Sequence, residues 1–220
     1  MVAVVCVIGA GICGLTSLKC LKDAGFTVKC FEIDKFVGGK WNGGNSNPIP
    51  RTTITNFPKS MLCFSDFPMN EGCSLYISAD QYARYFQEYA ENFGLLPFIN
   101  FDHEIIEIEA LKDFGDSKFQ WRVHFKSNGS SKIQTEFFHY VVISSGFNTI
   151  PYVPEKVSLV VAGFSGKLIH CIDYKTGEDF KNQKVIVCGL GNTGGKSPRY
   201  IIWGMSTVPA ADSHHNDFGT

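Results

Sequence analysis

The sequence has no excess of charge of either sign and no long apolar run. Its 20 basic and 21 acidic residues give a net charge of −1, and they form no basic stripe of the kind that binds nucleic acid or an anionic membrane. No uninterrupted apolar run approaches the ~20 residues that a membrane-spanning helix needs. We therefore expect small-molecule ligands, no nucleic-acid partner and no membrane span in this chain, with homo-oligomer formation left open.

The cysteines lack the spacing of a metal site or a redox motif. None of the eight stands in a CxxC pair, and we predict no metal site. Cys6, Cys30 and Cys188 lie within predicted strands, where a free thiol packs as a small apolar side chain. This pattern favours a reducing compartment over a disulfide framework, so we expect a cytoplasmic protein.

Two glycine-rich fingerprints each follow an apolar run. Residues 9–14 read Gly-Ala-Gly-Ile-Cys-Gly directly after Val4–Ile8, and residues 189–194 read Gly-Leu-Gly-Asn-Thr-Gly directly after Val185–Cys188. In dinucleotide-binding folds the first glycine permits a tight turn, the second lets the backbone approach a pyrophosphate, and the third lets the helix pack on the strand. Two copies predict two nucleotides, which is typical of electron transfer between two cofactors.

The pattern around the fingerprints predicts an α/β protein with two Rossmann-like dinucleotide-binding units. Val2–Ile8 is predicted as a buried strand, Ile12–Ala24 as a helix and Thr27–Glu32 as a second strand, which together make one βαβ unit. Lys184–Cys188 is predicted to open the second unit, which lacks its closing strand. We place a domain boundary near residue 150, before the rigid extended chain of residues 150–154.

The chain between the two units predicts one more helix and several strands. Ala79–Phe93 places aromatic residues at helical spacing, with Gly94 as a C-cap, and core packing is the favoured interpretation over cofactor contact. Glu104–Ala110 and Phe119–Lys126 alternate in hydropathy and predict a small antiparallel excursion. Val141–Gly146 predicts another buried strand.

Glu32 is a candidate nucleotide ligand. It ends the second predicted strand, 21 residues past Gly11. An acidic group at this place accepts hydrogen bonds from the ribose hydroxyls of an adenosine that carries no 2′-phosphate. The alternative interpretation is an exposed charge at a strand end.

Together these motifs resemble the flavin-containing monooxygenase family. Residues 38–41 look like the family's second flavin-contact motif, and residues 55–61 and 64–68 look like its active-site loop. Residues 164–174 fit the family signature FxGxxxHxxxY. The resemblance covers about residues 2 to 195, less than half of a usual member, so the chain resembles a truncated N-terminal portion of a dimethylaniline monooxygenase-like enzyme.

The resemblance implies a monooxygenase that uses FAD, NADPH and molecular oxygen to oxygenate a soft nucleophilic nitrogen or sulfur in a small amine or sulfide. It implies an FAD-binding domain over residues 1–150 and an incomplete NADPH-binding domain over 151–220, with a divergent tail from about 196. Carried over by position, the FAD-binding residues are Gly9, Gly11, Gly14, Glu32, Lys40 and Trp41. The NADPH-binding residues are Gly189, Gly191, Asn192, Thr193 and Gly194.

Asn56 is the catalytic candidate, because in the family an asparagine amide assists the oxygenation step. Its alternative is an Asx-type turn beside Pro58. His170 is interpreted as a residue that orders the linker between the nucleotide domains rather than as a general base.

Two alternatives remain for the chain as a whole. One is a catalytically inactive FAD-binding fragment or an interaction partner of a full-length enzyme, which the apparent truncation favours. The other is a disulfide reductase, which the absence of a paired cysteine disfavours. Full-length animal members of the family attach to the cytosolic face of the endoplasmic reticulum through C-terminal segments, so that location is expected only of a full-length relative.

Overall fold

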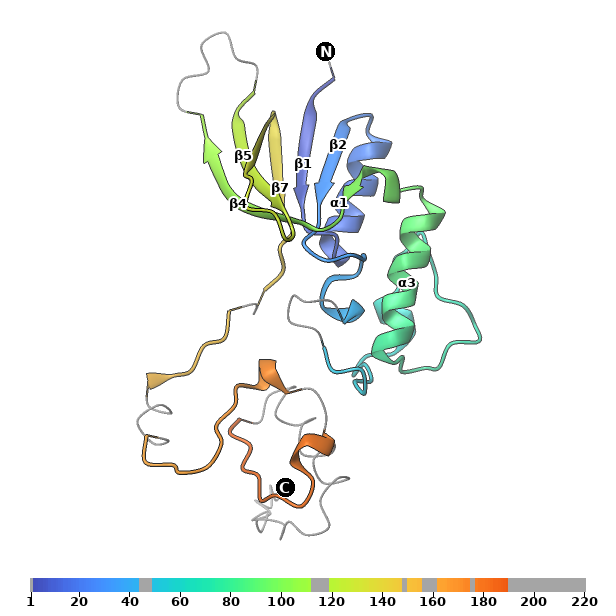
Figure 1. The fold of residues 1–220 in the computed structure, drawn as a ribbon. Coiled ribbons are helices and arrows are strands. Elements are labelled where there is room, and N and C mark those ends of the chain that lie inside the picture. The colour runs from blue at the N-terminus through green and yellow to red at the C-terminus, as the bar shows by residue number, and fades with distance from the viewer. Residues whose placement is uncertain are drawn as a thin grey trace, which may run out of the picture. The chain divides into compact units, whose positions relative to one another are not determined.

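A computed structural model describes residues 2–43, 49–111, 119–147, 150–155, 162–174 and 177–189. The chain divides into two compact units, residues 1–151 and 152–220 (Figure 1). No helix within these described ranges is long and apolar enough to cross a bilayer.

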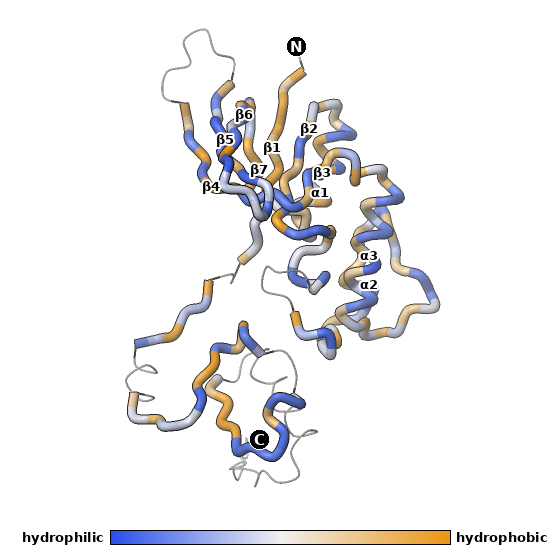
Figure 2. The backbone as a smooth tube through the Cα atoms, viewed as in Figure 1, coloured by the Kyte–Doolittle hydropathy of each residue, from blue (hydrophilic) through white to orange (hydrophobic). Residues whose placement is uncertain are grey.

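The first unit is built on a parallel sheet with the strand order β3-β2-β1-β7 (Figure 1). Its strands are β1 (Val4–Ile8), β2 (Thr27–Phe31), β3 (Ile99–Asn100) and β7 (Tyr140–Ile143). Helix α1 (Ile12–Asp23) connects β1 to β2, as the βαβ prediction required. Strand β1 pairs with β2 on one side and β7 on the other. Its sequence is uninterruptedly apolar (Figure 2), and its last four residues are buried.

Strand β7 is less buried than its sequence predicts. The expected buried strand over Val141–Gly146 is observed as Tyr140–Ile143, and the side chains of Tyr140 and Ile143 are 51% and 69% exposed. Among the described residues β7 pairs with β1 alone, so it is an edge strand, and its two end side chains have few neighbours to cover them. Continuous apolar runs are typical of strands covered on both faces, and here the run belongs to a strand at the end of the order.

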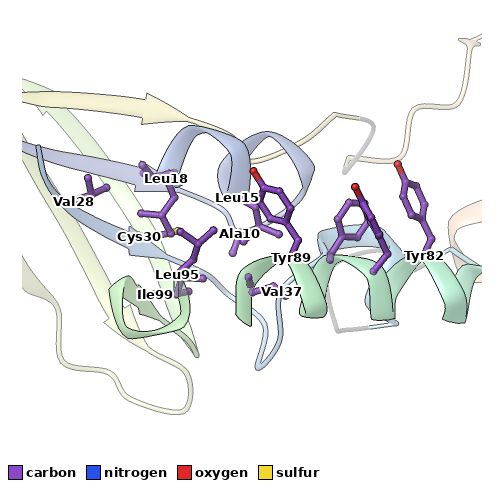
Figure 3. Close-up of a cluster of buried hydrophobic side chains, with 14 of the residues drawn as sticks. Ala10, Leu15, Leu18, Val28, Cys30, Val37, Tyr82, Tyr89, Leu95 and Ile99 are labelled. Carbon is purple, nitrogen blue, oxygen red and sulfur yellow. The ribbon is translucent and has the colours of Figure 1, made fainter. Parts of the chain in front are cut away.

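Helix α3 (Ala79–Asn92) packs the core on one face of the sheet. It starts with a capping box, in which the Ser78 side chain accepts from the amide of Gln81 and the Gln81 side chain accepts from the amide of Ser78. Gly94 follows the helix with a φ of 60°. The aromatic residues of α3 pack with α1 and the sheet in one hydrophobic cluster (Figure 3), so the core-packing interpretation is confirmed. The buried residues of α3 are Ala79, Tyr82, Tyr85, Phe86, Tyr89 and Ala90.

A three-stranded antiparallel sheet lies between β3 and β7 in the sequence. It has the order β4-β5-β6 and contains β4 (His103–Ala110), β5 (Trp121–Ser127) and β6 (Gln134–Phe138). The sequence predicts the first two strands, and β6 is an addition. The inner side chains pack against β1 and β2 of the parallel sheet in a second cluster, formed by Cys6, Ile8, Phe31, Val123, Phe125 and Phe138.

Two thiols lie inside this first unit. Cys6 on β1 and Cys30 on β2 have no exposed surface. Burial raises the pKa of the Cys6 thiol to about 12 and raises that of Cys30 further. All eight cysteines of the chain are free.

The second unit contains short elements around a small core. Helical turns η3 (Cys171–Asp173) and η4 (Gly177–Phe180) flank Tyr174, which packs with Ile169, Phe180 and Val185. His170 Nδ1 accepts a hydrogen bond from the amide of Ile172 at 3.2 Å, so this side chain caps η3.

The strand expected over Lys184–Cys188 is not formed. These residues are irregular, and the Ile186 side chain is 81% exposed. The described residues of this unit contain no strand, so the run has no neighbour to complete its backbone hydrogen bonds. Cys188 is accordingly exposed rather than packed in a strand.

Candidate functional site at the glycine turn after β1

The turn after β1 requires glycine at its first position. Gly9 has a φ of 95°, and its amide donates to the carbonyl of Phe31 at 2.7 Å. A Cβ atom added to Gly9 would lie 2.6 Å from the Ser144 carbonyl oxygen at the end of β7. Both the left-handed backbone and this close approach exclude a side chain.

The other two glycines of the turn meet different surroundings. A Cβ on Gly14 would lie 1.8 Å from the Gly9 carbonyl oxygen, so glycine lets α1 pack directly on the turn. A Cβ on Gly11 would find no atom closer than the Gly39 Cα at 3.8 Å. A side chain at Gly11 would therefore make only ordinary van der Waals contact with Gly39, so packing within the protein does not require glycine here. In a dinucleotide turn this second glycine is the one that the close approach of a ligand requires.

The N-terminus of α1 is suited to a phosphate. Gly11 is its N-cap residue, no side chain among the described residues caps it, and its first turn has no acidic residue. Unpaired amides at a helix N-terminus and the positive end of the helix dipole together favour an anion.

Glu32 is a buried side chain that binds the backbone of this turn. Its side chain accepts hydrogen bonds from the amide of Ala10 at 2.6 Å and from the amide of Asp34 at 2.9 Å. Only 4% of the residue is exposed, so the alternative of an exposed strand-end charge is wrong. Burial raises the pKa of the carboxyl, and the backbone hydrogen bonds partly oppose that rise. A carboxylate has about four acceptor positions, and the amides of Ala10, Asp34 and, more weakly, Ile33 act on this one, which leaves one position for a ligand.

A second glycine loop closes against the first. The amide of Gly38 donates to the carbonyl of Ala10 at 2.9 Å. Gly38 and Gly39 have φ values of 105° and 55°, and a Cβ on Gly39 would lie 3.3 Å from the Cα of Gly11. The resemblance to a second flavin-contact motif therefore falls on a segment that the structure places beside the fingerprint.

Lys40 and Trp41 extend from this loop in two directions. The ammonium of Lys40 donates to the carbonyl of Phe147 and lies 4.9 Å from the centre of that ring. The Trp41 ring packs edge-on against Tyr82 of α3, with centroids 4.7 Å apart and an interplanar angle of 67°. Lys40 thus fixes the loop to the segment after β7, and Trp41 fixes it to α3.

Asn56 lies on an exposed bend of a different segment. The backbone before it is held by Thr55, whose amide donates to the Ile77 carbonyl at 2.9 Å and whose Oγ1 accepts from the Ile77 amide at 3.1 Å. The Asn56 side chain makes no hydrogen bond with a described residue. The Asx-turn alternative fails chemically as well, because Pro58 has no amide hydrogen at the required position.

Tyr82 links these two segments and was assigned only to the core from the sequence. Its ring contacts Trp41, and its hydroxyl donates to the Leu62 carbonyl at 3.0 Å, in helix α2 (Lys59–Leu62). Burial raises the pKa of the Tyr82 hydroxyl to about 12. The aromatic spacing predicted its burial, and no signal in the sequence marked its hydroxyl partner.

The structure therefore unites only the first set of predicted residues. Gly9, Gly11, Gly14 and Glu32 meet at the β1–α1 turn, and Lys40 and Trp41 stand on the adjacent loop. Gly189 has a φ of 115°. Gly191, Asn192, Thr193 and Gly194 lie outside the described residues.

A parallel sheet in which β1 leads through a glycine turn into the N-terminus of α1 is the arrangement of a Rossmann-like α/β domain. The chain belongs to the flavin-binding monooxygenase-like family, whose sequence profile matches residues 2–200.

Curated relatives in this family are longer than the chain. It is 37% identical over 196 residues to dimethylaniline monooxygenase (N-oxide-forming) 2 of Pan troglodytes, a match that covers 86% of this chain and 36% of the relative. It is 36% identical over 196 residues to flavin-containing monooxygenase 2 of Homo sapiens, with the same coverage of both chains. The chain thus spans little more than a third of their length.

Solved structures share the fold at lower identity. S-allyl-L-cysteine S-oxygenase from Allium sativum aligns with a TM-score of 0.79 and 21% identity, over 93% of this chain and 50% of its own. Tmm from Pelagibacter sp. strain HTCC7211 aligns with a TM-score of 0.78 and 23% identity, over 94% of this chain and 50% of its own. These alignments support the α/β architecture.

Proposed function

We propose that the chain binds FAD at the β1–α1 turn and serves an NADPH- and oxygen-dependent monooxygenation of soft nitrogen or sulfur centres. The observation that carries the proposal is the turn itself. Close packing within the protein requires glycine at Gly9 and Gly14 but not at Gly11, which stands at a helix N-terminus that no described side chain caps. Family membership supports flavin as the ligand. The names of the curated relatives support amine oxygenation as the reaction class.

In this proposal the first turn binds the adenosine end of FAD. The α1 amides and the open backbone at Gly11 receive the pyrophosphate. Glu32 accepts from a ribose hydroxyl with the acceptor position that the amides of Ala10, Asp34 and Ile33 leave free. An ionised Glu32 at the far side of the ribose also disfavours a 2′-phosphate at this site, because two negative groups would then meet in a buried place.

Lys40, Trp41 and Asn56 belong to the flavin end in the same proposal. Bound FAD would supply the redox and oxygen chemistry, which no side chain of the protein provides. The protein's part is to orient the flavin and exclude water. Trp41 and Tyr82 contribute apolar surface to that task, and the Asn56 amide supplies a donor that no described neighbour occupies.

The second nucleotide, NADPH, is assigned by proposal to residues 189–194. Its support is the fingerprint and its position within residues 2–200 of the family match. The hydride from NADPH would reduce the flavin, so both sites are needed for turnover.

A second candidate function is FAD binding without turnover, either alone or beside a full-length enzyme. It is favoured by one observation: residues 184–188 are irregular where the second unit needs a strand.

The absorption spectrum of the purified protein distinguishes these functions. Bound flavin that bleaches with NADPH and recovers in air is the result expected for the enzyme, and product formation from an amine or sulfide completes that test. Bound flavin that NADPH leaves oxidised supports the second function. Absence of flavin after reconstitution with FAD would refute both.

A further inference from the structure

The outer face of the antiparallel sheet gathers acidic residues through a β-bulge. The β4–β5 register shifts between Ile105 and Glu107. Because of this shift, Ile105 and Ile108 both pack toward the core although they are three residues apart. Glu107 and Glu109 consequently share the opposite face of β4.

Strand β5 places a histidine and an arginine across from these carboxylates. Glu107 pairs in register with His124, and Glu109 with Arg122. One oxygen of each glutamate and one ring nitrogen of His124 lie within 4.8 Å of one another. His124 Nε2 is 3.7 Å from Glu109 Oε1. Three potential metal-ligand atoms from two hydrogen-bonded strands therefore converge at one point.

The charges at this point are not balanced by the neighbouring cations. Arg122 donates to Glu109 Oε2 at 3.0 Å, which leaves Oε1 facing His124. Within the described part of the chain Glu107 forms no ion pair. Two carboxylates therefore share one arginine, and an additional positive charge between them and the imidazole would be favoured.

A threonine orients the imidazole. Thr135 on β6 lies in register with His124, and its Oγ1 is 2.9 Å from His124 Nδ1. In the tautomer whose Nδ1–H donates to Thr135, Nε2 carries a free lone pair on the side of Glu109. Metal-binding histidines are commonly held by such a partner on the second ring nitrogen.

We propose that Glu107, Glu109 and His124 form an accessory site for a divalent transition ion such as Zn²⁺. Mixed imidazole and carboxylate ligands suit Zn²⁺ better than Mg²⁺ or Ca²⁺, which prefer oxygen ligands alone. Tetrahedral ligands about 2.0–2.1 Å from Zn²⁺ are roughly 3.3 Å apart. The Glu109–His124 separation of 3.7 Å is already near that value, and the exposed Glu107 side chain can rotate to bring its carboxylate equally near. The bound ion would clamp β4 to β5 independently of flavin.

The sequence predicted no metal site, because the cysteines lack the spacing of a metal-binding motif. The present cluster contains no cysteine and matches no such motif either. Its residues come from two strands, and the bulge decides which face Glu107 and Glu109 occupy. The doubled isoleucine at residues 105–106 is the one sequence signal for that bulge.

The test is a Zn²⁺ titration of the full chain followed through the imidazole resonances of its six histidines. We expect the His124 signals to shift and those of His103 and His139 to remain. E107Q should weaken binding about tenfold, and T135V should weaken it by a similar factor through loss of the orienting bond. R122Q should tighten binding, because it frees Glu109. E104Q is the matched control, since Glu104 lies on the same strand and pairs with Lys126.

The free cysteines supply the competing explanation for Zn²⁺ uptake. Binding that keeps its affinity in both E107Q and H124Q, or that leaves the His124 resonances in place, would assign the ion to other ligands, such as these thiols, and overturn the proposal. E107Q replaces an exposed side chain, so its result does not depend on the folding of H124Q.

Discussion

The Glu32 carboxylate holds the amide of Ala10 at 2.6 Å, so the end of β2 is tied to the turn that follows β1. The same residue accepts from the amide of Asp34 in its own segment. One side chain thus fixes the loop that the nucleotide is proposed to contact, and it does so from a buried place. Its replacement should therefore affect the turn and the ligand together.

E32Q should raise the dissociation constant for FAD by about tenfold or more. Glutamine accepts with one oxygen only, and a hydrogen bond to a charged group contributes about 1.5–3 kcal/mol. Titration with FAD, followed by quenching of flavin fluorescence, measures the change. E88Q on the exposed face of α3 is the control. Equal affinities in the two variants would remove Glu32 from the proposed site.

G14A and G11A should separate folding from binding. A methyl group at Gly14 meets the Gly9 carbonyl at 1.8 Å, so we expect a loss of about 3 kcal/mol or more in the free energy of unfolding. A methyl group at Gly11 meets only Gly39 at 3.8 Å, so G11A should fold normally and lose FAD affinity. Urea unfolding and flavin titration give the two quantities.

G25A controls for backbone strain in that comparison. Gly25 has a φ of 83° and no atom within 4 Å of an added Cβ, so strain alone should lower stability by about 1 kcal/mol. A G14A protein as stable as G25A would contradict the close packing of α1 on the turn.

The pH dependence of stability should carry a contribution from Glu32. Its pKa is raised in the folded protein, so the folded state holds the proton more tightly than the unfolded state does. The resulting stabilisation is complete below about pH 4.3, the ordinary pKa of a glutamate, and is lost as the pH rises through the raised value. Urea unfolding between pH 4 and 8 should show this decline in the wild type, and E32Q should lack it.

FAD affinity should change in the opposite direction over the same interval. Ribose hydroxyls donate to the ionised carboxylate, so binding should strengthen as Glu32 loses its proton. A wild-type affinity with the same pH profile as that of E32Q would argue against this contact.

N56S should leave the fold and FAD binding intact while lowering oxygenation. The exposed Asn56 side chain makes no hydrogen bond in the described structure, so the free energy of unfolding should change by no more than about 0.5 kcal/mol. Product formed per NADPH consumed is the quantity to measure in a preparation that turns over. A large loss of stability, or full coupling of NADPH to product, would show that Asn56 has a different role.

Lys59 should be needed to order the loop of residues 70–75. Its ammonium donates to the carbonyls of Asn70, Glu71 and Cys73 at 3.0, 2.9 and 2.8 Å. K59M should therefore increase amide hydrogen exchange over residues 70–75 and leave α1 protected. K35M is a control for charge alone, because Lys35 is exposed in another segment. Unchanged exchange in K59M would show that the backbone fixes this loop by itself.

The sequence predicted best where local pattern and tertiary environment agree. The β1–α1–β2 unit and α3 follow from apolar runs, glycine turns and helical spacing, and the structure confirms them with ends shifted by one or two residues. The sequence predicted less well where packing against distant segments decides whether a strand forms. Apolar residues 141–143 form an edge strand and residues 185–188 form none, because the sequence of a strand does not say which partners it will have.

The candidate site shows the same division. Spacing located Gly9, Gly11, Gly14 and Glu32, since they sit at fixed steps along one βαβ unit. It did not predict that the Tyr82 hydroxyl bonds the Leu62 carbonyl, or that the Ser144 carbonyl lies against Gly9, because each partner is distant in the sequence. Periodicity ranks a residue as buried and carries no information on the partner of its polar atom.

The two buried thiols of β1 and β2 can report how often the central strands separate. Alkylating reagents attack thiolates, and Cys6 and Cys30 are both protonated and sealed as long as the sheet is closed. Cys13 and Cys20 on the surface of α1 react without any such event. The lag between the two labelling phases therefore times how often the central strands separate, and a ligand that grips the turn after β1 should lengthen it.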